Sequence, residues 1–159
     1  MVSERAITFL IGLMGVSFCL NVWLRKGPAA QAKPVQRIQG SFWGAVSGFT
    51  SFISHSGGPP FQVYILPQKL SKAQFAGTAT LFFAVINAAK IIPYQFLRPY
   101  TLDALYESAF LVPTALLGTL AGAYVNRKLA DKWFFLVVQL ALFGISLKLL
   151  LDASGWLSS

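Results

Sequence analysis

The sequence predicts an all-α integral membrane protein, formed as a single membrane domain over residues 1–159 by four transmembrane helices and one broken, re-entrant helical hairpin. The composition is the first reason, since 55% of the residues are hydrophobic and only 11% are charged, whereas soluble domains carry about 25% charged residues. The second is a set of four long apolar runs. The third is a stretch rich in glycine and proline between the first two runs.

Four runs meet the length requirement of a transmembrane helix, which is roughly 20 apolar residues. They are Ala6–Leu24, Ala73–Leu97, Ala104–Val125 and Trp133–Leu151. The first run follows a weakly charged start and lacks an Ala-x-Ala-like end. We therefore interpret it as a retained membrane helix and not as a cleaved signal peptide.

The broken stretch, Ser54 to Pro60, places two glycines and two prolines where an unbroken helix would otherwise be expected. Such backbone is tolerated at membrane depth only where protein or a water-filled cavity satisfies the freed amide and carbonyl groups. The pieces on either side, Gly40–Ser54 and Pro60–Leu66, are short for a span. The stretch is therefore either a binding site within the membrane or a surface loop between two ordinary helices.

Loop charge distinguishes a re-entrant hairpin from a single crossing. If residues 40–66 enter the membrane and return, nine basic residues share one face, against Arg5 and Arg98 on the other; a single crossing divides them five against six. Cytoplasmic loops carry the excess of Lys and Arg, so the asymmetric arrangement is favoured and the tip points into the membrane from the cytoplasm. The nine residues are Arg25, Lys26, Lys33, Arg37, Lys69, Lys72, Arg127, Lys128 and Lys132.

The helix that follows the hairpin carries a largely polar face. Thr80, Phe83, Asn87, Lys90 and Tyr94 recur at spacings of three and four residues, which places them along one side of a helix. Because an isolated ammonium is costly at the depth of Lys90, we expect this side chain to face a cavity, a partner or an anionic ligand. The alternative is that it snorkels toward the headgroups.

The hairpin tip is expected to offer hydrogen-bond donors to an anion. Pro60 suits the first turn of a short helix, whose positive end would point at the tip together with the amides of Gly57 and Gly58. His55 adds an imidazole, which is a proton-exchanging group near neutral pH but more often a structural hydrogen-bonding group. The predicted substrate path is His55, Ser56, Gly57, Gly58, Pro59, Pro60, Gln62, Tyr64, Thr80, Asn87, Lys90 and Tyr94.

Other chemistry has little support in the sequence. It contains no paired carboxylates, no His/Cys metal cluster, no phosphate-binding loop and no nucleophile with its base, so we expect no enzyme activity, no metal and no cofactor. The formal charge of +8 is typical of cytoplasmic loops beside anionic lipid, and nucleic acid is not an expected partner. Gly118 and Gly122 form a Gly-x-x-x-Gly pair, which predicts close packing against another helix.

Two motifs and the polar face together carry a family resemblance. GAVSGFTSF at residues 44–52 is followed by SHSGGPPFQVY at 54–64, and then by Gly77, Thr78, Asn87, Lys90 and Tyr94. This pattern, over about residues 40–97, resembles the second-half signature of the sulfite exporter TauE/SafE family of membrane permeases. The resemblance implies transport of a small anion, such as sulfite or an organosulfur compound, across the bacterial inner membrane.

The resemblance also concerns how complete the transporter is. Family proteins usually contain two related halves, each with a glycine-rich motif, whereas this sequence contains one such motif. One alternative is a transporter half that associates with a second copy or with a complementary half. The other is a non-transporting membrane subunit or a truncated remnant that needs a partner.

Overall fold

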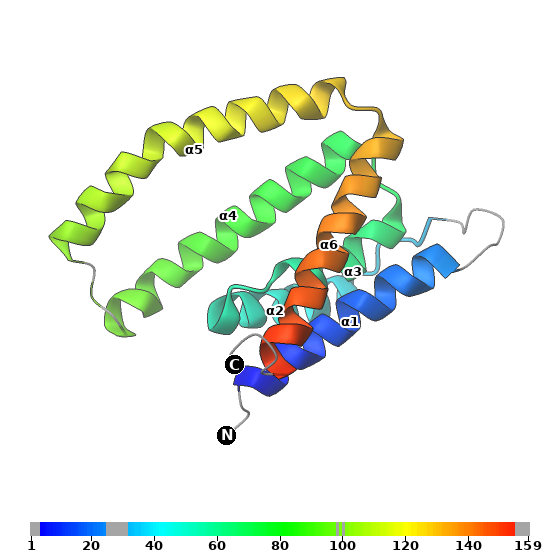
Figure 1. Cartoon of the computed structure of the whole chain (residues 1–159), viewed down its shortest axis with the longest axis horizontal. Helices are drawn as coiled ribbons and strands as arrows, with labels where there is room; N and C mark the ends of the chain where they lie inside the picture. Colours follow the sequence, from blue (N-terminus) through cyan, green and yellow to red (C-terminus); the bar gives the residue numbers. More distant parts are fainter. Residues whose placement is uncertain (1–3, 25–31, 98, 100, 155–159) are drawn as a thin grey trace.

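The computed structural model describes residues 4–24, 32–97, 99 and 101–154, and the regular structure in them is helical (Figure 1). The elements are α1 (Glu4–Leu24), α2 (Arg37–Ser54), α3 (Gly58–Ile65), the short 3-10 helix η1 (Leu66–Gln68), α4 (Lys72–Leu97), α5 (Leu102–Lys128) and α6 (Asp131–Ser154). Four of the helices, α1, α4, α5 and α6, are long and apolar enough to cross a membrane. This confirms the four predicted spans.

The observed helices extend beyond the apolar runs because polar residues end them. The side chain of Thr101 accepts a hydrogen bond from the amide of Ala104 at 3.2 Å and so caps the start of α5. Asp103 lies in the first turn of α5, and Arg127 and Lys128 lie in the last, where each charge opposes the helix dipole. The apolar run Ala104–Val125 alone therefore predicted a helix shorter than α5.

Helices α1 and α6 pack against each other in antiparallel directions. A Cβ added to Gly12 would lie 2.7 Å from the carbonyl oxygen of Ser146, and one added to Gly15 would overlap the Ser146 hydroxyl. Further along α1, the indole Nε1 of Trp23 donates to Oε1 of Gln139 at 3.0 Å. The close approach uses small residues, as in other membrane helix pairs.

Helices α2 and α3 form a hairpin whose two ends leave from the same side. The hydroxyl of Tyr64 donates to the carbonyl oxygen of Gln36 at 3.1 Å, and the amide of Lys33 donates to the carbonyl oxygen of Pro67 at 3.0 Å. These bonds join the residues before α2 to the end of α3. The chain therefore turns back at residues 55–57, as the broken stretch predicts.

An aromatic cluster joins the hairpin to α4 and α6. Phe61 of α3 stacks on Phe82 with ring centroids 4.9 Å apart, and Phe75 of α4 meets Phe134 edge to face at 5.8 Å. Phe61 and Phe75 are both buried. Aromatic pairs in these geometries add to the stabilisation from burial alone, so this cluster fixes α3 between the two long helices.

Three basic connections gather at the base of the hairpin. The Nζ of Lys72 donates to the carbonyl oxygen of Leu129 at 2.5 Å and lies 3.7 Å from a carboxylate oxygen of Asp131. The start of α4 therefore contacts the connection between α5 and α6. Pro67, which bonds to Lys33, lies only a few residues before this contact in the sequence. Three residues of the charge count, Arg25, Lys26 and Arg98, lie outside the described residues.

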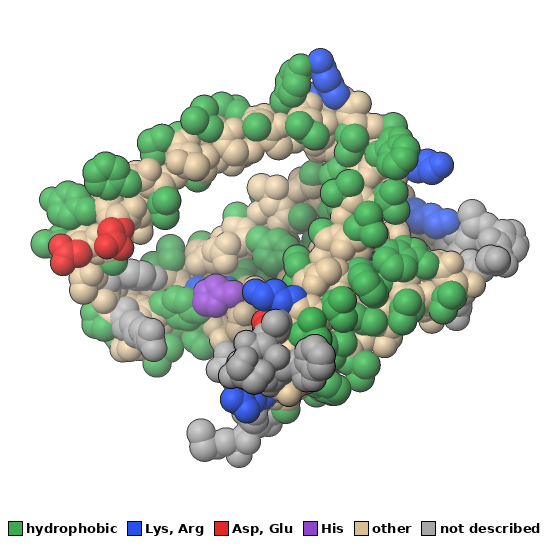
Figure 2. Space-filling model, viewed as in Figure 1, with side chains coloured by type: hydrophobic (Ala, Val, Ile, Leu, Met, Phe, Trp, Pro, Cys, Tyr) green, Lys and Arg blue, Asp and Glu red, His purple; other side chains and the backbone are tan. Residues whose placement is uncertain are grey.

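Helix α5 stands apart from the other described helices. None of its residues is buried against the described part of the protein, and Figure 2 shows an opening between it and the other helices. No atom of the described chain lies within 4 Å of a Cβ built on Gly118 or Gly122. The predicted Gly-x-x-x-Gly packing is therefore not formed among the described residues, where Gly12 and Gly15 provide the close helix contact instead.

Candidate functional site

The helix break begins where α2 ends at Ser54. His55 adopts the left-handed conformation with φ of 53°, and its amide donates to the carbonyl oxygen of Thr50. The amide of Ser56 donates to the same oxygen at 3.3 Å. These bonds satisfy a carbonyl group at the end of α2, in the manner of a left-handed helix cap. The predicted break is thus an ordered turn with its own hydrogen bonds.

Gly57 brings the turn into direct contact with α2. Its carbonyl oxygen accepts a hydrogen bond of 2.6 Å from the hydroxyl of Ser47. A Cβ at Gly57 would lie 2.7 Å from both the Ser47 carbonyl oxygen and the Ser51 Cβ. Because its φ is −72°, which other residues also adopt, glycine is needed here for space and not for conformation.

The second helix of the hairpin starts at Gly58, two residues before the predicted start at Pro60. Pro59 and Pro60 both lie buried in its first turns. Since proline has no amide proton, Gly58 is the first-turn residue before Phe61 that offers a backbone donor. At the positive end of α3, the backbone N–H groups that can donate to a ligand are therefore those of Gly57 and Gly58.

Lys90 holds the last turn of α2. Its Nζ donates to the carbonyl oxygen of Ser51 and to the Ser51 hydroxyl oxygen, each at 2.6 Å, and the residue is only 8% exposed. The ammonium therefore does not snorkel to the surface. It lies at the negative end of the α2 dipole, and two of its three N–H groups are directed to Ser51.

Tyr94 makes a second contact with the same turn. Its hydroxyl donates to the carbonyl oxygen of Phe52 at 2.8 Å, and the two rings lie 5.2 Å apart between centroids. The ring of His55 lies 6.2 Å from that of Tyr94. Lys90 and Tyr94, one turn apart on α4, thus meet the tip side of the hairpin as a pair.

The other predicted path residues lie in different surroundings. Thr80 and Asn87 are exposed on α4, beside the face that contacts the hairpin. Tyr64 lies at the base of the hairpin, at the end opposite the tip, where it bonds Gln36. The Oε1 of Gln62 is buried without a hydrogen-bond partner among the described residues, and a buried unpaired oxygen is unusual enough to require an explanation.

Three buried residues of α2 were not among the predicted site residues. Ser47, Thr50 and Ser51 line the side of α2 that receives Gly57 and Lys90. Their spacing of three and four residues was the available signal, because small hydroxyl side chains repeated on one face of a membrane helix permit close packing and hydrogen bonding. Within the described residues, no group of three His, Cys, Asp or Glu side chains could hold a metal ion.

The fold and the site define a multi-pass membrane protein in which a buried lysine holds the break of a helical hairpin. Residues 1–149 match the sulfite exporter TauE/SafE family, and the chain belongs to this family. The predicted resemblance covered about residues 40–97, so the match extends it into all four long apolar helices. The family consists of transporters and not enzymes. No protein with a curated description and no solved structure matches the chain.

Proposed function

We propose that this chain is a transporter, or a transporter half, that moves a small anion such as sulfite or an organosulfur compound across the bacterial inner membrane. The observation that carries the proposal is the buried ammonium of Lys90 beside the break between α2 and α3. Ionisable residues inside membrane segments commonly mark substrate or ion pathways. Family membership gives the class of substrate.

The path runs past the hairpin tip. One N–H of Lys90 is not engaged by Ser51, and the positive end of α3 begins at Gly58 on the other side of the turn. An anion at the tip is therefore attracted from two helices, as at the broken helices of other transporters. Gln62, Thr80 and Asn87 supply further polar groups along the path in this proposal, whereas the Ser56 hydroxyl, which donates to the carbonyl oxygen of Ser54, offers only an acceptor beside it.

The hairpin re-enters the membrane in this proposal. Its two ends leave together at the base, as the bond between Lys33 and Pro67 requires, and α2 is not one of the four helices long and apolar enough to span. The base lies on the side that carries seven of these loop cations among the described residues, and the positive-inside rule assigns that side to the cytoplasm. The tip then reaches into the bilayer from that side.

The chain also needs a partner in this proposal, either a second copy or a complementary half. The unburied length of α5 and the exposed Thr80 and Asn87 of α4 support this requirement, because polar side chains inside a span are rarely left against lipid. The loop charge inserts every copy in the same direction. A second copy is therefore related by a two-fold axis along the membrane normal, which gives a closed dimer.

A measurement of assembly tests the partner. Purified chain in mild detergent should sediment as a dimer, and Gly118→Ile should weaken that dimer because it fills the space needed for close helix approach. The control is Gly144→Ile, which changes another glycine with open space around it and should leave the dimer intact. Gly58→Ile is unsuitable because it alters the hairpin tip. A monomer that gains activity only with a complementary half excludes the second copy.

The second candidate function is a membrane subunit or remnant that does not transport. The observation that favours it is again α5, which leaves the hairpin open on one side in the single chain. A flux assay separates the two functions. Wild-type chain in proteoliposomes should move sulfite, sulfate or a simple sulfonate, whereas the subunit alternative predicts no flux for any of them.

The same assay tests the site. Lys90→Met should lower anion flux by about tenfold or more, the effect expected from losing a charge-assisted contact, while the protein still inserts and folds. Lys148→Met is the matched control, since Lys148 is an exposed lysine within another apolar helix, and its flux should stay close to that of wild type. Unchanged flux in folded Lys90→Met removes this residue from the mechanism.

A further inference from the structure

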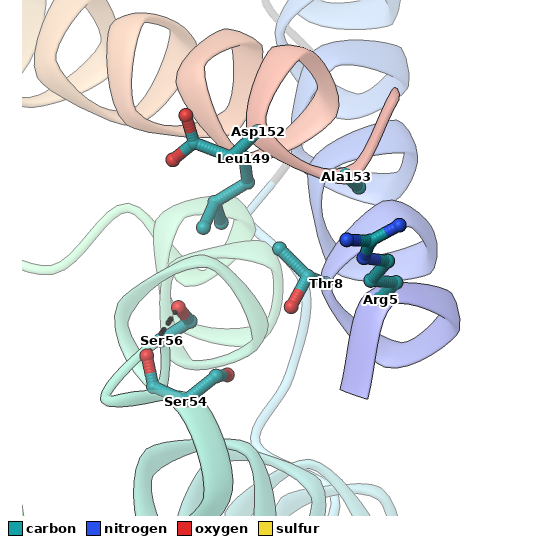
Figure 3. A pocket seen from close by; sticks show the side chains of 7 residues that line it. All are labelled: Arg5, Thr8, Ser54, Ser56, Leu149, Asp152 and Ala153. Carbon is teal, nitrogen blue, oxygen red and sulfur yellow. Dashed lines mark hydrogen bonds between the residues drawn. The ribbon is translucent and has the colours of Figure 1, made fainter. Parts of the chain in front are cut away.

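A cavity beside the hairpin tip shares one residue, Ser56, with the predicted substrate path and otherwise lies outside it. It has a volume of about 280 Å³ and opens to the surface at the end of the molecule opposite the basic connections. Three elements form it, the start of α1, the tip side of the hairpin and the end of α6 (Figure 3). Its lining residues are Arg5, Thr8, Ser54, Ser56, Leu149, Asp152 and Ala153.

Opposite charges occupy the two sides of this cavity. Figure 3 shows Arg5 on the α1 side and Asp152 on the α6 side, with Leu149 and Thr8 between them. The ion pair found among the described side chains joins Lys72 and Asp131, so neither Arg5 nor Asp152 is neutralised by a described partner within 4 Å. Both charges are exposed and available to a ligand.

The serine hydroxyls make the hairpin side of the cavity a hydrogen-bond acceptor. The Ser54 hydroxyl donates to the carbonyl oxygen of Thr50 at 3.1 Å, and the Ser56 hydroxyl donates to the carbonyl oxygen of Ser54 at 2.9 Å. Because each hydroxyl has a single proton, these oxygens can only accept a further hydrogen bond. This side therefore suits a donor such as an ammonium, and it does not suit a bare anion.

We propose that this cavity binds a small zwitterion at the mouth of the path. Its anionic group lies at Arg5, and its ammonium lies at Asp152 and the acceptor oxygens of Ser54 and Ser56. A simple anion of the same size would gain the contact with Arg5 but would face the Asp152 carboxylate without a compensating charge. The binding site itself follows from the cavity lining. Only its position at the start of a transport path rests on the proposed function.

Binding to the purified full-length chain tests the site with two probes of equal size. Isothermal titration calorimetry compares 2-aminoethanesulfonate, a zwitterion, with propane-1-sulfonate, in which a methyl group replaces the ammonium. We expect the zwitterion to bind about fivefold more tightly, the ratio expected for one partly exposed ion pair. Equal affinities for the two probes overturn the proposal.

Variants assign each half of the ligand. Asp152→Asn should bring the affinity ratio of the two probes close to one without weakening propane-1-sulfonate, and Arg5→Gln should weaken both probes. Asp103→Asn, the same change at the start of α5 and outside the cavity lining, should leave the ratio at its wild-type value. A ratio that survives Asp152→Asn overturns the proposal.

The two proposals fail in different ways. A chain that prefers the zwitterion but moves no anion in proteoliposomes contradicts the transport function and supports the binding site. A chain that moves sulfite but does not distinguish the probes contradicts the binding site alone.

Discussion

The Nζ of Lys90 lies 2.6 Å from the carbonyl oxygen of Ser51 and 2.6 Å from its hydroxyl oxygen, although 39 residues separate the two along the chain. A buried ammonium is stable only where acceptors replace its water. Here the acceptors belong to the last turn of α2, so the lysine fixes the helix end that precedes the tip. The same contact serves structure and the proposed path.

Substitutions at this pair should therefore lower stability unequally. Ser51→Ala removes only the hydroxyl acceptor and should cost about 1 kcal/mol, whereas Lys90→Met removes both contacts and should cost about 2–3 kcal/mol. Thermal unfolding in detergent measures both. The double variant should cost less than the sum, because the two residues share one interaction. Additive effects would show that the contact contributes little.

Any side chain at Gly57 should lower the stability of the protein. Gly57→Ala places a Cβ 2.7 Å from the backbone oxygen of Ser47, which forces the turn away from α2 and should cost about 1–3 kcal/mol. Gly58→Ala is the matched control, because no atom of the described chain lies within 4 Å of its added Cβ. Thermal unfolding should separate the two variants, and equal melting temperatures would contradict the close approach.

Substitutions at His55 separate the effect of its left-handed backbone from the effect of its imidazole contacts. Its φ of 53° costs a residue with a Cβ about 1–2 kcal/mol, and glycine relieves this strain while losing about 0.5–1 kcal/mol of chain entropy. His55→Gly should therefore unfold at the same temperature as wild type or slightly higher, and His55→Val should unfold lower. Destabilisation by His55→Gly would show that the imidazole contacts hold the turn.

Flux through the same variants separates the two roles of His55. If His55→Gly folds well and transports normally, the residue is structural. Loss of flux in a protein of undiminished stability would assign the imidazole to transport.

The glycines that pack α1 on α6 should also be sensitive. Gly15→Ala introduces a Cβ that overlaps the hydroxyl of Ser146, a residue with no exposed surface, and should cost about 1–3 kcal/mol. Gly144→Ala changes a glycine inside α6 whose added Cβ meets open space and should be neutral or raise stability slightly, because alanine loses less chain entropy than glycine in a helix. Unfolding followed by tryptophan fluorescence is suited to this comparison, since Trp23 contacts α6 through Gln139.

The contrast between these glycines shows what the sequence could predict. The four spans followed from local composition, because about 20 apolar residues suffice to favour the bilayer wherever they occur. Gly118 and Gly122 have the Gly-x-x-x-Gly spacing that favours packing, whereas Gly12 and Gly15 are three residues apart, so which glycines meet a neighbour depends on which helices become adjacent. A single sequence does not contain that information in any one segment.

The candidate site likewise has one part that the sequence predicted and one part that it did not. The glycines and prolines of the tip predicted the break at its observed position, because their backbone chemistry is local. For Lys90, depth predicted that a partner is needed, but the partner proved to be the backbone of α2 and its hydroxyl residues. Such a contact is set by how the hairpin lies on α4, which periodicity along α4 does not determine.

Labelling from one side of the membrane tests the re-entrant hairpin. With Cys19 replaced by alanine, single cysteines at Gln36, Lys69, Ala130 and Thr101 place thiols at exposed positions. A membrane-impermeant maleimide added to inside-out vesicles should label the first three, because the bonds from Lys33 to Pro67 and from Lys72 to Leu129 hold these connections at one end.

Thr101 should react only when the reagent is added from the opposite side, since it starts α5 beyond the far end of α4. Permeabilised vesicles, in which all four positions should react, control for thiols that are accessible to water but poorly reactive. Labelling of Lys69 together with Thr101 would mean that α2 and α3 cross the membrane. The loop charges would then divide five against six, and the positive-inside rule would no longer define an orientation.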